Sequence, residues 1–285
     1  MNKNPLFSIL VANYNNGRYF KECYESIIRQ TYQNFEVIIV DDGSEDNSVE
    51  LIENIIAENP KFKLYQNEKN YGCGYTKRRC AELATGEICG FLDPDDALVS
   101  DALEIMADAH LKNPDKGHIY SNLIYCDENL NKIKIKKNEP IENRNPYYYN
   151  LDHKVNALST FKKSDYLKTE GINPYMRRAI DMDLYFKLYE VTDTLYIDCD
   201  LYIYRIHSGG ISTLENTNKA NFWHWFAIMK AAERRNVNVE NLFLENFYRK
   251  NEAEEYYKAL HLLKKSRLIK LFQTFGFLKW LNKIK

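Results

Sequence analysis

The sequence has no excess of charge of either sign and no long hydrophobic run. Its 39 Lys and Arg residues nearly balance its 40 Asp and Glu residues, so the net charge is −1 and gives no reason to expect a nucleic acid partner. No apolar stretch reaches the roughly 18 residues of a membrane-spanning helix, and the N-terminal apolar run is interrupted at Asn13. We therefore expect neither a signal peptide nor a transmembrane helix, and a cytoplasmic protein that is at most peripheral on the inner face of the membrane.

The six cysteines include no C-x-x-C pair, and no internal repeat is evident. Their spacing fits neither a zinc site nor a dense disulfide framework, so a reducing compartment is the simplest expectation. The 285 residues are 45% hydrophobic and 28% charged, which is ordinary for a globular protein. This length favours one large domain with an appendage.

The first half alternates short apolar runs with segments of helical periodicity. We predict strands at 6–12, 35–40, 62–65, 88–92 and 118–125, and helices at 19–28, 48–58, 75–84 and 101–110. This order predicts an α/β fold with a mostly parallel sheet flanked by helices. Ligands of such sheets bind beyond the carboxyl ends of the strands.

The second half is less regular. Residues 129–156 are polar and predict a hairpin and a long loop, which we expect to lie over the site. A helix is predicted at 181–190 and one or two strands at 195–206, and the pattern is helical from about residue 219 to the end. We therefore predict a domain at 1–212 and a C-terminal helical region at 213–285.

Two acidic clusters follow predicted strands and should share one crevice. In the first, Asp93 and Asp95 are separated by Pro94, and such carboxylates can hold Mg²⁺ or Mn²⁺ together with diphosphate oxygens and water. The alternative is a turn in which Asp96 caps the next helix. In the second cluster, Asp42 could accept a hydrogen bond from a base N–H, or could cap a helix together with Ser44 or Ser48.

The segment NYGCGYTK, residues 70–77, follows a predicted strand and opens a helix. Gly72 and Gly74 would allow close backbone approach, the helix N-terminus favours phosphate, and Lys77 or Arg78 could reach a diphosphate. It is neither a Walker A loop nor a complete dinucleotide fingerprint, because Lys77 stands where a third glycine would be. A loop before a basic helix start is the other interpretation.

Asp181 and Asp183 begin a predicted helix, where acidic residues suit the helix dipole. One of them could instead be the general base toward an acceptor hydroxyl. His207 follows a predicted strand and is either an ordinary loop residue or a ligand for a metal or a phosphate.

Five blocks in this order resemble the family 2 glycosyltransferases of the GT-A fold. They are SILVANYN, SIIRQTYQNFEVIIVDDGS, NYGCGYTKRRCAELATGEICGFLDPDD, IDMDLYFKL and YRIHSGGIS, and they span residues 7–212. The resemblance implies a GT-A fold and an inverting enzyme that moves a sugar from a nucleotide diphosphate donor, expected to be a UDP-sugar, to an acceptor hydroxyl. Such an acceptor would be a glycan or a lipid-linked intermediate of surface polysaccharide synthesis.

The resemblance also implies donor and metal contacts. Ala12 and Tyr14 would flank the uracil, and Asp42 would bond its N3. Asp93 would lie near the ribose and the metal, and Asp95 would be the principal ligand of Mn²⁺ or Mg²⁺.

For the reaction itself, the resemblance implies that Asp181 takes the acceptor proton and that His207 lies near the metal and the diphosphate. Three positions depart from the family pattern. Ile180 replaces an acidic residue before the base, Lys77-Arg78 replaces Arg-Asn, and Glu170-Gly171 replaces a Gly-Gly pair. The first departure leaves a choice between Asp181 and Asp183, of which we prefer Asp181.

The last 22 residues contain seven Lys or Arg, no acidic residue and interleaved apolar side chains. Such a helix suits an anionic membrane surface, and the alternative is packing on the domain or on a second subunit in a homodimer. Two other functions stay open: a catalytically silent sugar-nucleotide-binding scaffold and a nucleotidyltransferase. An NAD-dependent oxidoreductase fits less well, because its glycine motif is incomplete and lies late in the chain.

Overall fold

A computed structural model describes residues 4–207, 209 and 216–248, with positions 255, 258, 261, 262 and 265 beyond them. Contacts within the chain group it into two compact units, residues 1–235 and 236–285. The larger unit contains every element discussed as part of the site. The predicted boundary at residue 212 and a membrane role for the C-terminal region stay predictions.

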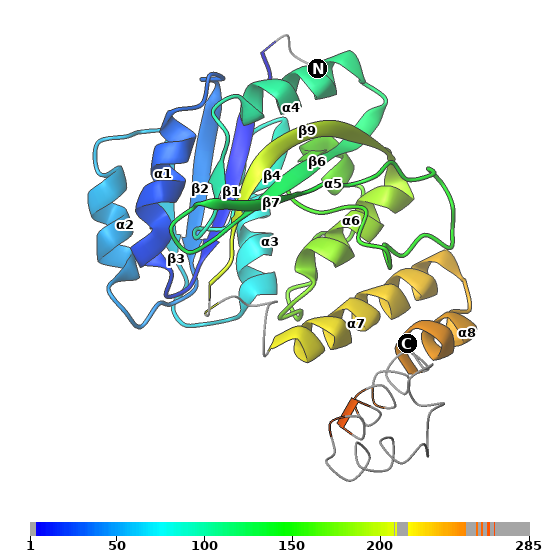
Figure 1. Cartoon of the computed structure of the whole chain (residues 1–285). Helices are drawn as coiled ribbons and strands as arrows, with labels where there is room; N and C mark the ends of the chain where they lie inside the picture. Colours follow the sequence, from blue (N-terminus) through cyan, green and yellow to red (C-terminus); the bar gives the residue numbers. More distant parts are fainter. Residues whose placement is uncertain are drawn as a thin grey trace. The chain divides into compact units, whose positions relative to one another are not determined.

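The N-terminal half of the sheet is parallel (Figure 1). Its neighbouring strands lie in the order β3, β2, β1, β4, with bounds Phe62–Gln66, Phe35–Asp41, Phe7–Asn13 and Ile88–Phe91. All seven residues of β2 are buried, which explains its nearly continuous apolar run. Because the three pairings are parallel, the ends of β1, β2 and β4 open at one edge of the sheet.

The C-terminal half makes the sheet mixed. It continues from β4 through β8, β6, β9 and β5, with bounds Ser159–Lys162, Lys116–Cys126, Asp193–Arg205 and Ala97–Leu98, and β7, Lys132–Lys136, pairs with β6. β8 is antiparallel to both neighbours, whereas β6 and β9 are parallel. The parallel arrangement predicted for the sheet therefore holds for its first four strands and for one later pair.

Helices pack on this sheet through their apolar faces. The larger unit has α1 to α7, with bounds Phe20–Ile28, Ser48–Ile56, Cys73–Leu83, Ala102–Lys112, Lys163–Tyr166, Ile180–Val191 and Thr217–Arg235, and a 3₁₀ turn η1 at Gly17–Tyr19. One core cluster joins β1 and β2 to α1, α2 and α4, and takes alternate residues Phe7, Ile9 and Val11 from β1. The helix α3 packs on β1 and β2, and α7 packs on α6.

The smaller unit is described only in part. It contains α8, Glu240–Phe243, and a π-helical turn at Leu244–Tyr248. The basic segment 264–285 lies outside the described residues, apart from Lys265.

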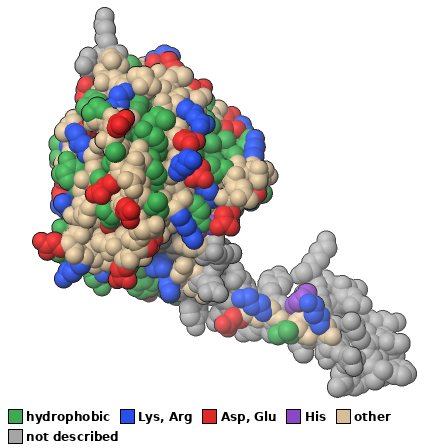
Figure 2. All heavy atoms as spheres, turned by 90° about the vertical axis from the view of Figure 1, so that its left-hand side faces the viewer, with side chains coloured by type: hydrophobic (Ala, Val, Ile, Leu, Met, Phe, Trp, Pro, Cys, Tyr) green, Lys and Arg blue, Asp and Glu red, His purple; other side chains and the backbone are tan. Residues whose placement is uncertain are grey.

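None of the helices in the described part of the chain combines the length and apolar character that crossing a membrane requires. Figure 2 shows Lys and Arg interspersed with Asp and Glu on the face that carries α1 and α2. This mixture agrees with the near-zero net charge of the sequence.

Candidate active site

A cleft of about 910 Å³ lies at the carboxyl ends of β1, β2 and β4. It is lined by all eight residues selected from the sequence: Ala12, Tyr14, Asp42, Lys77, Asp93, Asp95, Asp181 and His207. These side chains come from positions up to 195 residues apart in the sequence (207 − 12), and only the fold brings them together. Their individual roles stay predictions.

Asp42 is buried just after β2 and holds the loop before α3. Its Oδ1 accepts hydrogen bonds from Asn67 Nδ2 at 2.7 Å and Tyr71 N at 2.9 Å, and its Oδ2 accepts one from Gly72 N at 2.7 Å. It does not cap α2, whose N-cap is Asn47 without a side-chain hydrogen bond. A carboxylate has about four acceptor positions, so one is left for a base N–H entering the cleft.

The two glycines of the 70–77 segment allow the close approach of another part of the chain. A side chain at Gly72 would collide with the guanidinium of Arg177, and one at Gly74 would collide with the carbonyl oxygens of Asn173 and Met176. Gly72 also has a φ of +97°, which favours glycine. The loop preceding α6 therefore approaches closely here, and phosphate binding at the start of α3 stays a prediction.

That loop is tied to the start of α3 by two hydrogen bonds. Gly74 N donates to Met176 O at 3.1 Å, and Arg177 Nη1 donates to Tyr71 O at 3.2 Å. Arg177 and Arg178 both line the cleft, as Arg18 does from η1. These arginines were missed in the sequence, because no local pattern marks them and only the fold turns them toward the cleft.

The turn after β4 brings Asp95 against His207. Asp95 Oδ2 lies 2.8 Å from His207 Nε2, and the imidazole is packed 4.8 Å from the Tyr19 ring. Gly209 N donates to His207 Nδ1 at 3.2 Å, so the ring proton lies on Nε2 and is donated to Asp95.

A buried network holds this turn in place. Tyr202 OH donates to Asp96 Oδ2 at 2.7 Å and accepts a hydrogen bond from Asp93 N at 3.2 Å. Arg205 donates from its backbone N to Asp96 Oδ1 and from its Nε to Asp95 O, at 2.8 and 2.7 Å. Asp96 therefore anchors the turn to β9 and does not cap α4, whose N-cap is Asp101.

Burial raises the pKa of the Asp96 carboxyl well above its ordinary value, and the charges of Asp95 and Asp93 add to this effect. The anchoring contacts of Asp96, Tyr202 and Arg205 were not predicted from the sequence, because the partners lie more than 100 residues apart. The only signal was their closeness in the sequence to selected residues, Asp95 and His207.

The Asp95–His207 pair fits a hard divalent cation. Two neighbouring ligand atoms on an octahedral ion with bonds of about 2.1 Å lie roughly 3 Å apart, close to the observed separation of these atoms. A cation held by both would take the place of the proton that these two atoms share. Among the described residues, no three His, Cys, Asp or Glu side chains are grouped to hold a metal, so diphosphate oxygens and water would complete its shell.

Lys77 projects from the first turn of α3 to Asp93, and their Nζ and Oδ1 atoms lie 2.9 Å apart. Burial lowers the pKa of the Lys77 ammonium, but the carboxylates of Asp93 and Asp181 outweigh this and raise it above its usual value. Lys77 is therefore a fixed positive charge that pairs with Asp93 and interacts electrostatically with Asp181.

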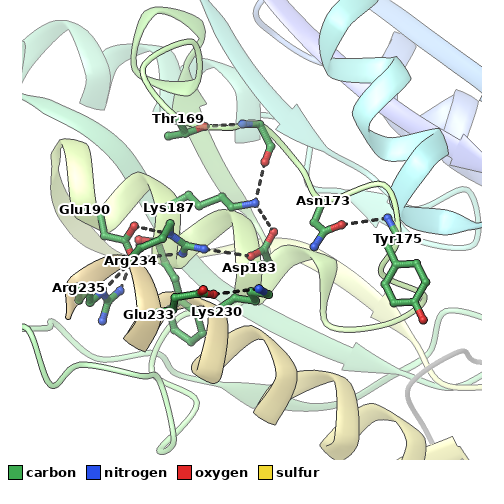
Figure 3. Close-up of polar contacts among 12 residues, drawn as sticks. Thr169, Asn173, Tyr175, Asp183, Lys187, Glu190, Lys230, Glu233, Arg234 and Arg235 are labelled. Carbon is green, nitrogen blue, oxygen red and sulfur yellow. Dashed lines mark hydrogen bonds and ion pairs between the residues drawn. The ribbon is translucent and has the colours of Figure 1, made fainter. Parts of the chain in front are cut away.

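Asp181 and Asp183 differ in their access to the cleft, and which of them is the base stays a prediction. Asp181 is open to the cleft, and partial desolvation by the surrounding walls raises its pKa while the charge of Lys77 opposes that rise. Asp183 is buried, and its Oδ2 accepts a hydrogen bond from Lys187 Nζ at 2.7 Å (Figure 3). Asp183 does not line the cleft, so Asp181 is the carboxylate that an acceptor can reach.

Residues 8–167, more than half of the chain, match the model of glycosyl transferase family 2. This chain belongs to glycosyl transferase family 2. The match confirms the resemblance drawn from the five sequence blocks.

Relatives agree with this assignment. The chain is 31% identical over 208 residues to the chondroitin synthase of Escherichia coli, covering 73% of this chain and 30% of that protein. It is 29% identical over 228 residues to glycosyltransferase GlyG of Streptococcus pneumoniae, covering 74% of each. The chain thus spans under a third of the synthase and about three quarters of GlyG.

Solved structures confirm the predicted GT-A fold. S. aureus TarS 1-349 in complex with UDP-GlcNAc superposes with a TM-score of 0.64 at 20% identity, over 78% of this chain and 66% of that one. Mannosyltransferase PcManGT from Pyrobaculum calidifontis, in complex with GDP-Man and Mn²⁺, superposes with a TM-score of 0.66 at 16% identity, over 98% and 83%.

Proposed function

We propose that this family 2 member is an inverting glycosyltransferase that moves a sugar from a nucleotide diphosphate, most simply a UDP-sugar, to an acceptor hydroxyl. The observation that carries the proposal is the single cleft shared by Asp42, the Asp95–His207 pair and Asp181. Asp42 suits a nucleobase, the Asp95–His207 pair suits a metal ion with its diphosphate, and Asp181 suits the acceptor proton.

The donor would lie along the cleft from the end of β1 to the turn after β4. Tyr14 is 39% exposed and offers a ring to the base, Ala12 leaves room beside it, and Asp42 keeps one acceptor position for its N–H. Lys77 and the cleft arginines would neutralise the diphosphate. The UDP-GlcNAc bound to TarS supports a UDP donor. Because PcManGT binds GDP-Man, binding of GDP should be compared with binding of UDP.

In the reaction, the acceptor oxygen attacks the anomeric carbon as the bond from that carbon to the diphosphate breaks. The acceptor proton passes to Asp181, and the bonding electrons leave with the nucleoside diphosphate. A bound Mn²⁺ or Mg²⁺ would supply Lewis-acid stabilisation of the charge on the leaving diphosphate. Lys77 holds Asp93 in place and lies close enough to Asp181 to favour its ionised form.

A glycan or lipid-linked acceptor and surface polysaccharide synthesis belong to the same proposal. The named synthase relative makes a polysaccharide, which supports that class of acceptor. A location on the cytoplasmic side, where sugar nucleotides are made, is the matching expectation.

Calorimetric titration with UDP, with and without Mn²⁺, tests the donor site. We expect UDP to bind more tightly with Mn²⁺, and the Asp95→Asn variant to lose this metal-dependent gain because one metal ligand is gone. Asp108→Asn is the matched control, since Asp108 is an exposed carboxylate on α4 outside the cleft.

Folded protein that binds no UDP under either condition contradicts the UDP-donor assignment. UDP binding with no release of UDP from any UDP-sugar, even with acceptors present, would favour the silent scaffold instead. GDP binding in preference to UDP would keep the reaction and change the donor.

A further inference from the structure

Four aromatic side chains, two of them exposed and two half-buried, cluster on the surface of the larger unit. The aromatic patch consists of Tyr175, Phe222, Trp223 and Phe226. Tyr175 lies on the loop before α6 and the other three on the first half of α7, with ring centroids 5.7 Å apart for Tyr175 and Trp223 and 5.4 Å apart for Trp223 and Phe226. Tyr175 is 70% exposed and Phe222 60% exposed.

None of the four rings belongs to the buried hydrophobic core. The helix α7 buries a different face, formed by Trp225, Ala227, Ile228 and Ala231. Figure 3 shows the Tyr175 ring directed away from Asp183 and the polar cluster around it. A contiguous exposed aromatic surface on a folded unit is typical of a binding site.

The loop that carries Tyr175 also lines the cleft. Tyr175 precedes by only two and three residues the arginines Arg177 and Arg178, which line that cleft. Asp181 lies six positions after Tyr175, so their Cα atoms are at most about 22 Å apart even on a straight chain. The hydrogen bonds of Met176 and Arg177 to the start of α3 fix this loop.

The surroundings favour a saccharide over a lipid bilayer. A pyranose has a face of C–H groups that packs on an aromatic ring and an edge of hydroxyls that needs polar partners. The exposed amides of Asn218 and Asn221 flank the rings on α7. One turn beyond the patch, Lys230 and Glu233 form an exposed ion pair, and charges of both signs there would oppose insertion into a bilayer.

We propose that the aromatic patch is the acceptor subsite, where one sugar unit of a glycan acceptor stacks on Tyr175 and Trp223 while a hydroxyl of the same glycan reaches Asp181. The proposal rests on the proposed function for the role of Asp181, but binding of a glycan to the patch can be measured without turnover.

Binding of N-acetylglucosamine oligosaccharides and chondroitin oligosaccharides to the intact chain tests this subsite by calorimetry. We expect Trp223→Ala and Tyr175→Ala each to weaken glycan binding by roughly tenfold or more, and Trp223→Tyr to retain most of it because a ring remains. UDP binding with Mn²⁺ should be unchanged in all three. Leu167→Ala is the control, because Leu167 is 69% exposed and outside both the patch and the cleft.

Glycan affinity that is unchanged in Trp223→Ala and Tyr175→Ala overturns the proposal, as does a folded protein that binds no member of the panel. Loss of phosphatidylglycerol-vesicle binding in these variants, without any glycan binding, would assign the patch to a membrane instead. If UDP binding fails but glycan binding depends on Trp223, the donor assignment is wrong and the subsite stands.

Discussion

Two carboxylates two residues apart on α6 have opposite environments. Asp181 opens to the cleft beside Lys77, whereas Asp183 is enclosed with Lys187 and has Arg234 Nη1 at 3.9 Å. Successive helical positions point about 100° apart, so a separation of two places the side chains on opposite sides of the helix. One can therefore face substrate while the other anchors the helix.

Replacement of Asp181 by Asn should remove the base without removing the donor site. We expect kcat to fall by about 10²–10⁴-fold, because amide nitrogen and oxygen cannot take the acceptor proton. Steady-state rates with a UDP-sugar and an acceptor measure this loss, and UDP binding with Mn²⁺ checks that the cleft is intact. Near-normal turnover in Asp181→Asn would show that another group is the base.

At the scale of elements, hydrogen bonds and ion pairs on the side away from the cleft hold α6 to its neighbours. Lys187 Nζ donates to Asp183 Oδ2 and to Gly171 O, at 2.7 and 2.8 Å. From the end of α7, Arg234 and Arg235 both pair with Glu190 on α6 (Figure 3). These contacts fix the helix whose first turn carries Asp181.

Replacing one member of the buried Asp183–Lys187 pair should destabilise the protein far more than replacing both members. We expect Lys187→Met to lower the free energy of unfolding by about 3–5 kcal/mol, because Asp183 is left buried without its close partner. The double variant Asp183→Leu with Lys187→Met should recover much of that loss. Urea unfolding measures both, and a double variant no more stable than Lys187→Met would contradict this view of the pair.

The helices and strands of the first half could be predicted because each has a clear period and a clear end. For example, β2 is a run of apolar residues that stops at Asp41-Asp42, and its predicted and observed bounds differ by one residue. The short strand β8 was missed, since four residues reading Ser-Thr-Phe-Lys show no periodicity.

The site was predictable only where a family block marks it. Asp95 and His207 lie in such blocks, and the structure brings them within 2.8 Å of each other. Arg205 and Asp96 gain their roles from contacts across the sheet, and Gly72 gains its role from Arg177 more than 100 residues later. A local sequence pattern cannot predict contacts between residues so far apart in the chain.

At the scale of the whole molecule, buried histidines link stability to pH. Burial lowers the pKa of His110 and of His118 to about 3 and that of His224 to about 4, from an ordinary value of 6.5. These three histidines therefore bind more protons in the unfolded chain than in the folded chain below pH 6.5. Their contribution to stability is fully present above that pH and is lost as the pH falls toward 3–4.

Removal of one histidine should flatten this dependence. We expect His224→Phe to reduce the slope of the unfolding free energy against pH by up to about 1.4 kcal/mol per pH unit between pH 6.5 and 5. Urea unfolding across this range measures the slope. Asp96 and Asp181, whose pKa values are raised, contribute with the opposite sign, but they are common to both proteins and cancel in the comparison. Equal slopes in the two proteins would contradict the burial of a neutral His224.

The dependence of the turn at residues 93–96 on β9 also has a consequence for synthesis of the protein. Residues 93–96 leave the ribosome more than 100 residues before Tyr202, Arg205 and His207, which hold that turn in its working shape. A nascent chain that ends before β9 has the acidic motif without its support. Under the proposed function, donor cleavage would therefore begin only once nearly the whole larger unit has been made.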